Sequence, residues 1–589
     1  MSRRLAAAAL LAASAVGCGI PLAELSTGPI NACESTSDCA AGGVCAAVDT
    51  GNACVSTDAD LAGLLLEIRP AAGSPYGANV TYIIDVAEQG TALQDSAPDG
   101  QVRRFDPRLP ELARVSGKLQ LDPDALDCGP SVRGGSFPAT VLFTPILPYL
   151  GLNVEPYKAS LEVEIDDDGK LLGYSFQADV PSGAYDLYVA PQPPEGCTKV
   201  SPPISLPAQQ IMGNTAINII ADAPVKLSGT LQVPETDSVE GWFLEVVESE
   251  HGNVISEIQT LQQENPEFAL LDLNFDWTYR KGYTPLLRLR PPEGSALPTL
   301  HWDLSAVGLS GPDSLSLSLS ELNAAPRHVE GQVLDAAGTP VIASVQIQSA
   351  AISGDVSSTA RYKLETETDE EGVFAADLPP GKYRVIARPT ADATKAISEE
   401  EIVVLPGDGC FCGQSITVPE RSMLRGSAQG PLGESMSSAY VVVTPSLSST
   451  TRYLDKVLAL EPLQPREQSM PLQTTAFALP VDPGEFDFSV RPADGSLYPW
   501  LVRSRLSVSA ADIAPASDLD PMTVSYPVAL QGVIRAPSGG SLSESVVRAW
   551  VPVKEPSGTG RVVGLIQIGE TLAGSDGGYV LPLPPSISE

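Results

Sequence analysis

A short motif recurs five times along this chain of 589 residues and constrains its fold more than any other feature. The motif consists of an apolar residue, any residue, a glycine, any residue and a second apolar residue. Copies lie about 100 residues apart, a spacing typical of one small domain per copy. The length of the chain also favours several domains, since a single core stops growing well below this size. The five glycines are Gly117, Gly229, Gly331, Gly426 and Gly532.

The segments that follow each glycine predict β-strands. Apolar and polar residues alternate in stretches such as 139–145, 176–191, 439–445 and 547–552, and proline or glycine stands near their ends. No stretch keeps the 3.6-residue period of a helix. Short strands at regular spacing are typical of sandwiches. We therefore expect an all-β protein made of tandem antiparallel β-sandwich repeats.

The repeat sets the expected organisation of the chain. The expected parts are a signal peptide at 1–17, a disulfide-rich knot and stalk at 18–59, a β-hairpin segment at 60–111, sandwich repeat 1 at 112–223, a divergent repeat 2 at 224–325, repeat 3 at 326–419, repeat 4 at 420–526 and an incomplete repeat 5 at 527–589.

The third copy carries the fullest set of motif residues. It opens at His328 with Val-Glu-Gly-Gln-Val, continues through Gly372 and Phe374, and reaches a Leu-Pro-Pro-Gly-Lys-Tyr turn with Gly381. This pattern resembles the carboxypeptidase regulatory-like domain, and the resemblance implies a transthyretin-like, seven-stranded antiparallel sandwich with a carbohydrate-binding-like fold. The match is fullest over 328–389, partial in the copies that start near 115, 421 and 527, and thinnest near 225. Gly372 and Gly381 are interpreted as scaffold residues at turns.

Charge and motif content argue against nucleic-acid binding and catalysis. The chain has 36 basic and 72 acidic residues, a net charge of -36, so nucleic acid would be repelled. Only three histidines occur, His251, His301 and His328, and none has a glutamate at the third following position, as a zinc carboxypeptidase site requires. A Gly-x-Ser-x-Gly elbow, a P-loop and a dinucleotide fingerprint are absent as well. We expect no catalytic residues, no cofactor and no metal.

The first residues predict a secreted, lipid-anchored protein. Arg3 and Arg4 precede an apolar run, 5–16, that is too short to span a bilayer and is typical of a cleaved signal peptide. The run ends in Ala-Val-Gly before Cys18, which resembles the lipobox of bacterial lipoproteins, although Ala15 stands where leucine is usual. The resemblance implies lipid attachment at Cys18. An ordinary disulfide cysteine is the alternative.

The cysteine count supports the lipid. The chain has nine cysteines, which is an odd number. Assigning one to lipid leaves eight, and an even number is expected for disulfides in an oxidising compartment. Two disulfides are expected in the knot, and the sequence does not decide which cysteines pair. A zinc site is disfavoured there, because the cysteines are not spaced as zinc ligands and no histidine is near. A third bridge is expected between the next two cysteines. The last two flank one phenylalanine, so that a bridge closes a tight loop, with a redox role as the alternative. The eight are Cys33, Cys39, Cys45, Cys54, Cys128, Cys197, Cys410 and Cys412.

Two further segments are candidate sites. Phe275, Trp277 and Tyr279 share one face of a predicted strand and are a candidate platform for stacking on sugar rings. The alternative, which we favour, is that this face forms the core of repeat 2. The run 166–169, three aspartates and a glycine, is interpreted as a solvated turn, since an EF-hand needs carboxylates at alternate positions and a distant glutamate.

The last copy is predicted to be incomplete. It reaches its Leu-Pro turn near 582 but lacks the strands that follow this turn in other copies, whereas segments 64–70 and 102–105 resemble those strands. Open sandwich edges are sticky, and donated strands can fill them. We expect 527–589 to be unstable alone, with an edge filled by another chain or left open by truncation. Residues 62–110 are expected to pack on repeat 1 as an extra hairpin, in preference to closing a ring within one chain.

These features together predict a non-catalytic envelope protein. Gly19 follows the lipidated cysteine, which in the familiar sorting rule permits transfer to the outer membrane. The expected work is binding or adhesion, with a glycan or protein ligand, no nucleic acid, and contact with the membrane through the lipid alone. A passive envelope spacer and an accessory subunit of an envelope protease or uptake complex are the alternatives. The ligand and the face of the membrane are left open.

Overall fold

The structure is a computed structural model, and within the residues it describes the chain is built almost entirely of strands. The short 3-10 helix η1 (Thr36–Asp38) is the one named helical element there. No helix in these ranges is long and apolar enough to cross a membrane. The described residues are 33–41, 43–48, 51–56, 64–71, 74, 80–84, 94–95, 102–122, 126–146, 156–221, 225–232, 239–262, 270–277, 284–292, 299–304, 314–318, 326–352, 359–407, 409–436, 438–446, 453, 465–472, 475–493, 496, 498–511, 516–554 and 562–587.

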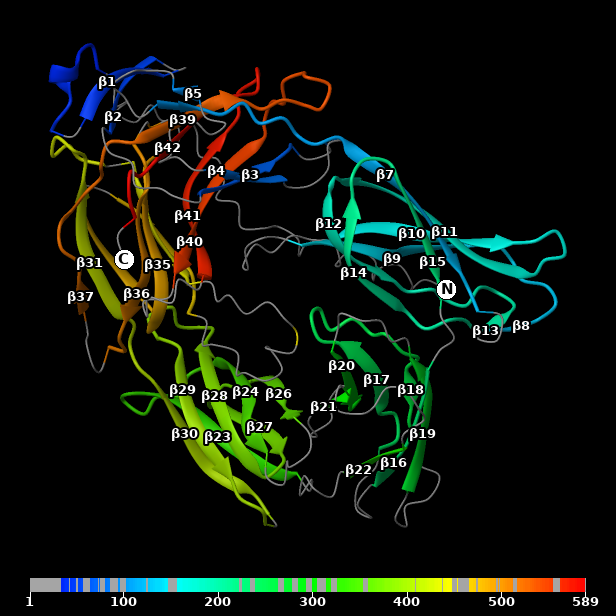
Figure 1. Cartoon of the computed structure of the whole chain (residues 1–589). Coiled ribbons are helices and arrows are strands. Elements are labelled where there is room, and N and C mark those ends of the chain that lie inside the picture. The colour runs from blue at the N-terminus through cyan, green and yellow to red at the C-terminus, as the bar shows by residue number, and fades with distance from the viewer. Residues whose placement is uncertain are drawn as a thin grey trace, which may run out of the picture.

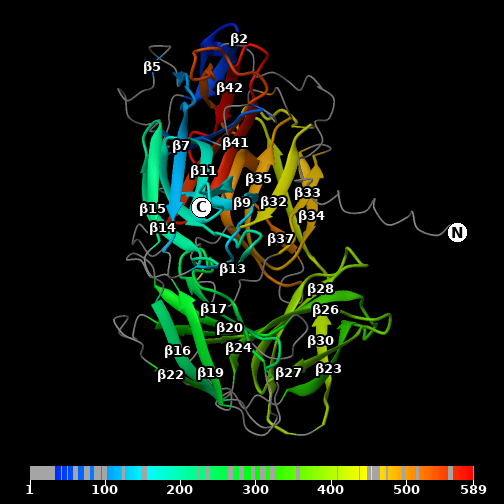
Figure 2. The same ribbon diagram turned by 90° about the vertical axis from the view of Figure 1, so that its right-hand side faces the viewer.

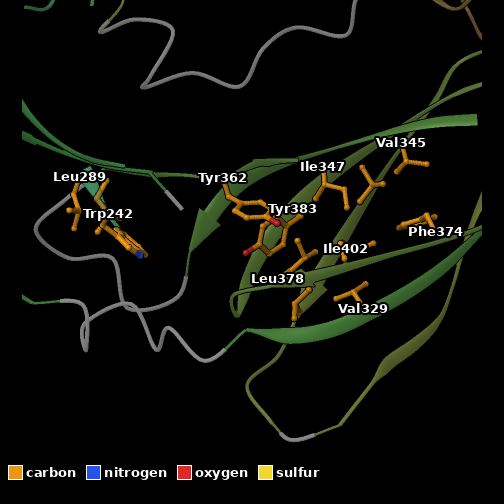
Figure 3. Packing of buried hydrophobic residues seen from close by; sticks show 14 of the residues in the cluster. Trp242, Leu289, Val329, Val345, Ile347, Tyr362, Phe374, Leu378, Tyr383 and Ile402 are labelled. Atoms are coloured by element: carbon orange, nitrogen blue, oxygen red, sulfur yellow. The ribbon is translucent and has the colours of Figure 1, made fainter. Parts of the chain in front are cut away.

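Unit 3, which starts at β23, shows the repeating architecture most clearly. A three-stranded sheet in the order β27-β23-β30 and a four-stranded sheet in the order β26-β24-β28-β29 form a sandwich. Side chains such as Val329, Val345 and Phe374 meet between the sheets (Figure 3). The strands are β23 (Arg327–Asp335), β24 (Ala343–Ile352), β25 (Thr359–Arg361), β26 (Lys363–Glu367), β27 (Val373–Leu378), β28 (Gly381–Pro389), β29 (Ser398–Val404) and β30 (Phe411–Val418).

The two most characteristic sequence motifs of the repeat lie directly opposite each other. In unit 3, Gly331 of β23 pairs with Phe374 of β27, and the phenylalanine ring covers the glycine so closely that a Cβ there would lie 2.4 Å from the ring. Gly117 with Phe176 and Gly426 with Phe477 repeat this arrangement. The motif glycine is therefore needed because an aromatic ring from the neighbouring strand occupies the space of its side chain.

The tyrosine of the Leu-Pro-Pro-Gly-Lys-Tyr turn ties that turn together. The hydroxyl of the buried Tyr383 donates to the carbonyl oxygen of Pro379 at 2.6 Å, and Tyr185 donates to Pro181 at the same distance in unit 1. Burial raises the pKa of both hydroxyls well above their usual value, so they remain donors across the physiological range. The Pro-x-Gly-x-Tyr spacing thus specifies a turn that supplies its own buried hydrogen bond.

The sandwich differs from the expected antiparallel one in a single strand pair. β30 runs parallel to β23, because the chain crosses to the other sheet for β28 and β29 and then re-enters the first sheet in the direction of its first strand. Units 1, 2 and 4 make the same parallel pair, between β15 and β7, between β22 and β16, and between β37 or β38 and β31.

Units 1, 2 and 4 vary this plan. Unit 1 is one seven-stranded sheet whose two edge strands, β14 and β15, contribute Ile211 and Ile219 to a common core. In unit 2 the larger sheet gains a strand from unit 3, since β25 pairs with β21. The cores of units 2 and 3 form one cluster, to which Trp242 and Tyr383 both belong.

The strands of these units are as follows. Unit 1 contains β7 (Leu112–Gln120), β8 (Asp127–Cys128), β9 (Ser136–Pro145), β10 (Tyr157–Ile165), β11 (Leu171–Pro181), β12 (Gly183–Val189), β13 (Cys197–Lys199), β14 (Ile204–Ile211) and β15 (Thr215–Ile220). Unit 2 contains β16 (Val225–Gln232), β17 (Phe243–Glu248), β18 (Gln259–Thr260), β19 (Leu270–Trp277), β20 (Pro285–Arg290), β21 (Thr299–Asp303) and β22 (Ser314–Ser318). Unit 4 contains β31 (Ser422–Gln429), β32 (Tyr440–Pro445), β33 (Gln468–Pro471), β34 (Ala476–Val481), β35 (Gly484–Arg491), β36 (Leu501–Val508), β37 (Ala516–Asp518) and β38 (Met522–Thr523).

Unit 5 is assembled from two distant parts of the chain. Its sheets have the orders β42-β39-β6-β5 and β4-β3-β40-β41, so that strands from 64–104 complete a sandwich begun by 528–583. The strands are β3 (Leu64–Arg69), β4 (Val80–Ile84), β5 (Gln94–Asp95), β6 (Val102–Arg104), β39 (Val528–Val533), β40 (Val546–Lys554), β41 (Val562–Leu572) and β42 (Gly578–Leu583).

This assembly corrects the sequence-based prediction for 62–110. These residues do not form an extra hairpin on unit 1, and the edge of the last copy is filled by the same chain. The physical reason is that β3 and β6 take the places that β28 and β30 hold in unit 3, and that Leu64, Leu66 and Ile68 fill the core of unit 5. The five units consequently follow one another around a closed circuit, here called the ring (Figure 1).

The disulfide-rich knot, residues 33–56, packs on unit 5. Its hairpin of β1 (Gly43–Val48) and β2 (Gly51–Ser56) shares a small core, including Val55, with Val102 and Ala529. The amide of Ala40 donates to the hydroxyl of Tyr526 at 2.6 Å. The knot was expected to form a stalk; instead it packs on unit 5, at the top of the view in Figure 2.

Candidate functional site

The predicted ligand and lipid residues fall largely outside the described part of the chain. Cys18 and Tyr279 lie outside the described residues, and for Phe275 and Trp277 the backbone alone is described, in β19. The register opposes Phe275 to Leu227, a core residue, and Trp277 to Val225, which packs against the core. This register favours a core strand over an exposed platform, and a ligand site at these residues stays a prediction.

The cysteines form four disulfides. The knot pairs Cys33 with Cys45 and Cys39 with Cys54, which resolves the open connectivity. The predicted bridge between Cys128 and Cys197 joins β8 to β13. Cys410 pairs with Cys412 at the exposed start of β30, where the pairing of β30 with β23 shifts register.

Among the described residues one metal-like grouping occurs, formed by Cys33, Cys39 and Cys54. All three sulfur atoms are engaged in disulfides. A zinc site needs thiolates, and so these cysteines do not fit one.

The turn at 166–169 matches its prediction. The carboxylate of Asp166 accepts the backbone N–H groups of Asp168 and Lys170 at 3.0 and 2.7 Å, and Gly169 has a φ of 80°. Asp167 and Asp168 are exposed. The aspartates therefore form a solvated turn stabilised by its first member.

The densest group of buried charges lies on β17 and β20 of unit 2. Glu245, whose side chain is 1% exposed, accepts the Nε–H groups of Arg288 at 2.7 Å and Arg290 at 3.3 Å. The nearby Glu248, also fully buried, accepts backbone N–H groups of the turn that follows β17, including those of His251 and Asn253. A buried carboxylate is tolerated when it is paired in this way.

Unit 4 reaches across the ring to this group through Tyr453. Its hydroxyl lies 2.8 Å from Nε2 of the buried His301 and accepts from Arg288 at 3.1 Å, while its backbone N–H donates to the carbonyl of Glu250 at 2.7 Å. The ring also fills the space beside Gly252, where a Cβ would lie 2.5 Å from it. Tyr453 thus connects two units that are not neighbours along the chain.

Unit 1 approaches the same group from the other side. Asp186 of β12 bonds Nε2 of His251 at 2.9 Å, and this bond raises the pKa of the histidine above its usual value of 6.5 although burial opposes the rise. Tyr188 of the same strand donates to the carbonyl of Val254 at 2.9 Å. Burial, aided by Glu248 and Glu245, raises the pKa of Tyr188 to about 12, so the hydroxyl stays a donor.

A second buried charge joins units 3 and 4. Asp482, fully buried, accepts from Nη2 of Arg466 at 2.7 Å and from Nε of Arg421 at 3.3 Å, and it also accepts the amide of Ile397 in unit 3. Burial alone would raise the pKa of this carboxyl, but its bonds to Arg466 and its attraction to both arginines lower it overall. Arg466 in turn donates to the carbonyls of Pro389 and Lys395 across the boundary.

These contacts act as joints rather than as reactive groups. The carboxylates of Glu245, Glu248, Asp186 and Asp482 are each engaged by guanidinium, imidazole or backbone donors of this chain, and His251 and His301 bond Asp186 and Tyr453. The histidines stand out in the sequence, whereas the contacts between units do not. Their signal is weak: charged residues at 245, 248, 288 and 290 interrupt otherwise apolar strands, and only the folded chain brings 186, 251, 301 and 453 together.

Comparisons with known proteins leave the family open. No family model and no curated protein sequence matches the chain. Solved structures with similar local geometry include a streptococcal ancillary pilin, 11% identical, covering 50% of this chain and 98% of the pilin at a TM-score of 0.20. The TIE protein of Bacillus anthracis is 10% identical, and the match covers 70% of this chain and 74% of the TIE chain at a TM-score of 0.16. The pilus adhesin SpaC of Lactobacillus rhamnosus GG, in its open conformation, is 11% identical. The match covers 78% of this chain and 56% of the adhesin at a TM-score of 0.15.

Proposed function

We propose that this chain is a non-catalytic bacterial envelope lipoprotein, tethered through Cys18, that displays a ring of β-sandwich units for binding or adhesion. The observation that carries the proposal is the use of buried charges. Asp482, His251 and Tyr453 hold successive or opposite units in fixed relation. A display scaffold needs units in fixed relative positions. The conformational entropy is then lost when the protein folds and not when a ligand binds.

The ligand class follows from the same proposal. A net charge of -36 excludes anionic polymers as partners, so the expected ligand is a neutral or cationic glycan, or a protein. Repeat 3 carries the resemblance to the carboxypeptidase regulatory-like domain, and that resemblance supports a binding role for the unit without adding a catalytic one.

The anchoring part is tested by replacing Cys18. In a Gram-negative host, Cys18→Ala should move the protein from the membrane to the soluble fraction and abolish incorporation of labelled fatty acid, because a lipid with two or three chains supplies the attachment. Ser14→Ala, four residues earlier, is the matched control and should stay membrane-bound and labelled. The anchor would be refuted if the Cys18→Ala protein remained in the membrane and wild-type protein incorporated no labelled fatty acid.

The binding part is tested on the same protein. Soluble Cys18→Ala protein should bind immobilised cell-wall glycan or outer-surface protein saturably. The amount of bound protein should reach a plateau as its concentration rises. Saturable binding supports display for adhesion. Binding that increases linearly with concentration on every surface supports the spacer alternative and contradicts the proposal.

A further inference from the structure

Unit 5 is the one unit whose two sheets both depend on strands from a distant part of the chain. β3 pairs antiparallel with β40, from Leu65 opposite Trp550 to Arg69 opposite Val546, and β6 pairs parallel with β39. The residue after β6 continues the contact, since the amide of Phe105 donates to the carbonyl of Gln531 at 2.8 Å. We call these pairings the closing joint.

The closing joint buries the centre of the unit. Leu64, Leu66 and Ile68 of β3 are fully buried and belong to one cluster with Leu530 and Val547. Each such side chain contributes about 1.5–3 kcal/mol when removed from water. The part comprising 528–583 therefore has both an exposed core and open sheet edges unless a β3 and a β6 are supplied.

No covalent bond secures the closing joint among the described residues. Both bridges of the knot lie within 33–54, and the other two join residues of unit 1 and residues of unit 3. The segment 33–104 can accordingly leave unit 5 without bond breakage. What keeps it in place is strand pairing, packing and the high effective concentration of a segment in the same chain.

Specific polar contacts identify the segment that the joint accepts. Nε1 of Trp550 donates to the carboxylate of Glu67 at 3.1 Å, and Glu67 is buried. The amide of Val533 donates to the carboxylate of Asp106 at 2.9 Å, and the hydroxyl of Tyr579 donates to the carbonyl of Phe105 at 2.8 Å. An unrelated strand would leave the partly buried indole of Trp550 and hydroxyl of Tyr579 unpaired, at a cost of about 1–3 kcal/mol each. A second copy of this chain satisfies them all.

We infer that the closing joint is also a self-assembly site, at which β3, β6 and the residues that follow β6 through Asp106 in one copy complete unit 5 of another. The same strand pairs and side-chain contacts form in both arrangements, so that only chain connectivity and concentration decide between a closed monomer and linked copies. Reciprocal exchange gives a dimer, and head-to-tail exchange gives longer assemblies. The inference is independent of the anchor and of any ligand.

The experiment uses the full chain with Cys18 replaced by Ala and one cysteine added on either side of the joint, so that the added thiol is the one cysteine outside the four disulfides. Leu66 and Ala549 are directly opposed, and opposed Cβ atoms in a sheet lie close to disulfide range. Chains carrying Leu66→Cys and chains carrying Ala549→Cys are mixed, opened in mild denaturant, returned to native buffer at increasing concentration and oxidised. The expected result is a covalent heterodimer whose yield rises at least tenfold between micromolar and near-millimolar protein.

Matched controls make the outcome decisive. A single chain carrying both changes should form an internal bond, which shows that the positions can react. Leu66→Cys mixed with Leu572→Cys should give no heterodimer, because β40 separates β3 from β41. If these core changes impair folding, Arg104→Cys with Gln531→Cys probes the parallel pair instead. Wild-type protein that stays monomeric by light scattering after the same treatment, or mixed chains that fail to cross-link while the double variant closes internally, would overturn the inference.

Discussion

At the scale of single residues, the chain uses buried charges where units meet. A buried ion pair adds little net stability compared with a well-packed apolar contact, but removing one partner leaves a costly unpaired charge. Asp482 is such a position, because two arginines and two backbone amides converge on it at the boundary of units 3 and 4.

Replacing Asp482 by Ala should lower the free energy of unfolding of units 3 and 4 by about 3–5 kcal/mol, since Arg421 and Arg466 lose their buried counter-ion. Chemical denaturation monitored by amide exchange in these units measures the change. Asp179→Ala is the control: its pair with Arg114 is exposed, and such pairs contribute less than about 1 kcal/mol.

Because the pKa of Asp482 is lowered, the contribution of this carboxylate to stability should persist at neutral pH and fade as the pH falls below the usual value of 3.8. Equal effects of the two substitutions would contradict the assignment.

His251 should make the contact between units 1 and 2 depend on pH. Its pKa is raised in the folded protein, so its contribution is complete below the unfolded value of 6.5 and is lost as the pH rises through the folded value. The facing charges are Asp186 on β12 and Glu248 and Glu250 on its own turn. The protection factors of the amides in the turn after β17 should fall as the pH rises from 6.5 through the raised pKa in wild type, but show no such step in His251→Gln. His328→Gln, in unit 3, serves as control, and a step that persists without His251 would contradict this role.

At the scale of elements, the repeat motif describes a strand pair rather than a single strand. The glycine of one strand and the phenylalanine of the next form a single packing unit, in which the ring replaces the missing side chain. Unit 2 has Leu273 in the register position opposite Gly229, where the other units have an aromatic residue, and this is the copy whose sequence match is thinnest.

Replacing Gly331 by Ala should destabilise unit 3 by about 1–3 kcal/mol, because the buried ring of Phe374 cannot move away from the added Cβ. The measurement is the denaturation midpoint of that unit. Gly540→Ala is a suitable control, since nothing lies within 4 Å of its Cβ position. In Gly331→Ala combined with Phe374→Leu, the two losses should be less than additive. Full additivity would show that the glycine and the ring act independently.

At the scale of the whole molecule, two features convert a row of units into a ring. The closing joint makes unit 5 from two distant segments (Figure 1), and Tyr453 connects unit 4 to unit 2 through its bonds to His301 and Arg288. Replacing Tyr453 by Phe should weaken this brace by about 0.5–1.5 kcal/mol through loss of the hydroxyl's bonds to His301 and Arg288, and Tyr453→Ala should weaken it further.

Amide exchange in β20 and β21 reports this effect, with β27 of unit 3 as the internal control. Protection should fall in the order wild type, Tyr453→Phe, Tyr453→Ala in β20 and β21 alone. Unchanged protection in Tyr453→Ala would show that the brace contributes nothing to the ring.

The sequence alone determined the features that depend on neighbours along the chain. Alternation and turn residues predicted the strands, the period predicted the tandem sandwiches, and the position of two cysteines within one repeat predicted the bridge between Cys128 and Cys197. It also identified 64–70 and 102–105 as strands of the kind that the last copy lacks. The strand predictions rest on local propensity, which a few adjacent residues specify, whereas the period and the bridge within one repeat come from comparing the copies along the chain.

Only the tertiary structure decided which strands pair and which charges meet. The five copies share one motif and offer similar edges, so a strand such as β3 shows in sequence that it needs a partner but not that its partner is β40. The same holds for Tyr453 and His301, which lie 152 residues apart and make a joint only after the units have folded. Pairing at such distances is chosen by the whole packed core, because each contact repays the entropy of ordering only when the others have formed.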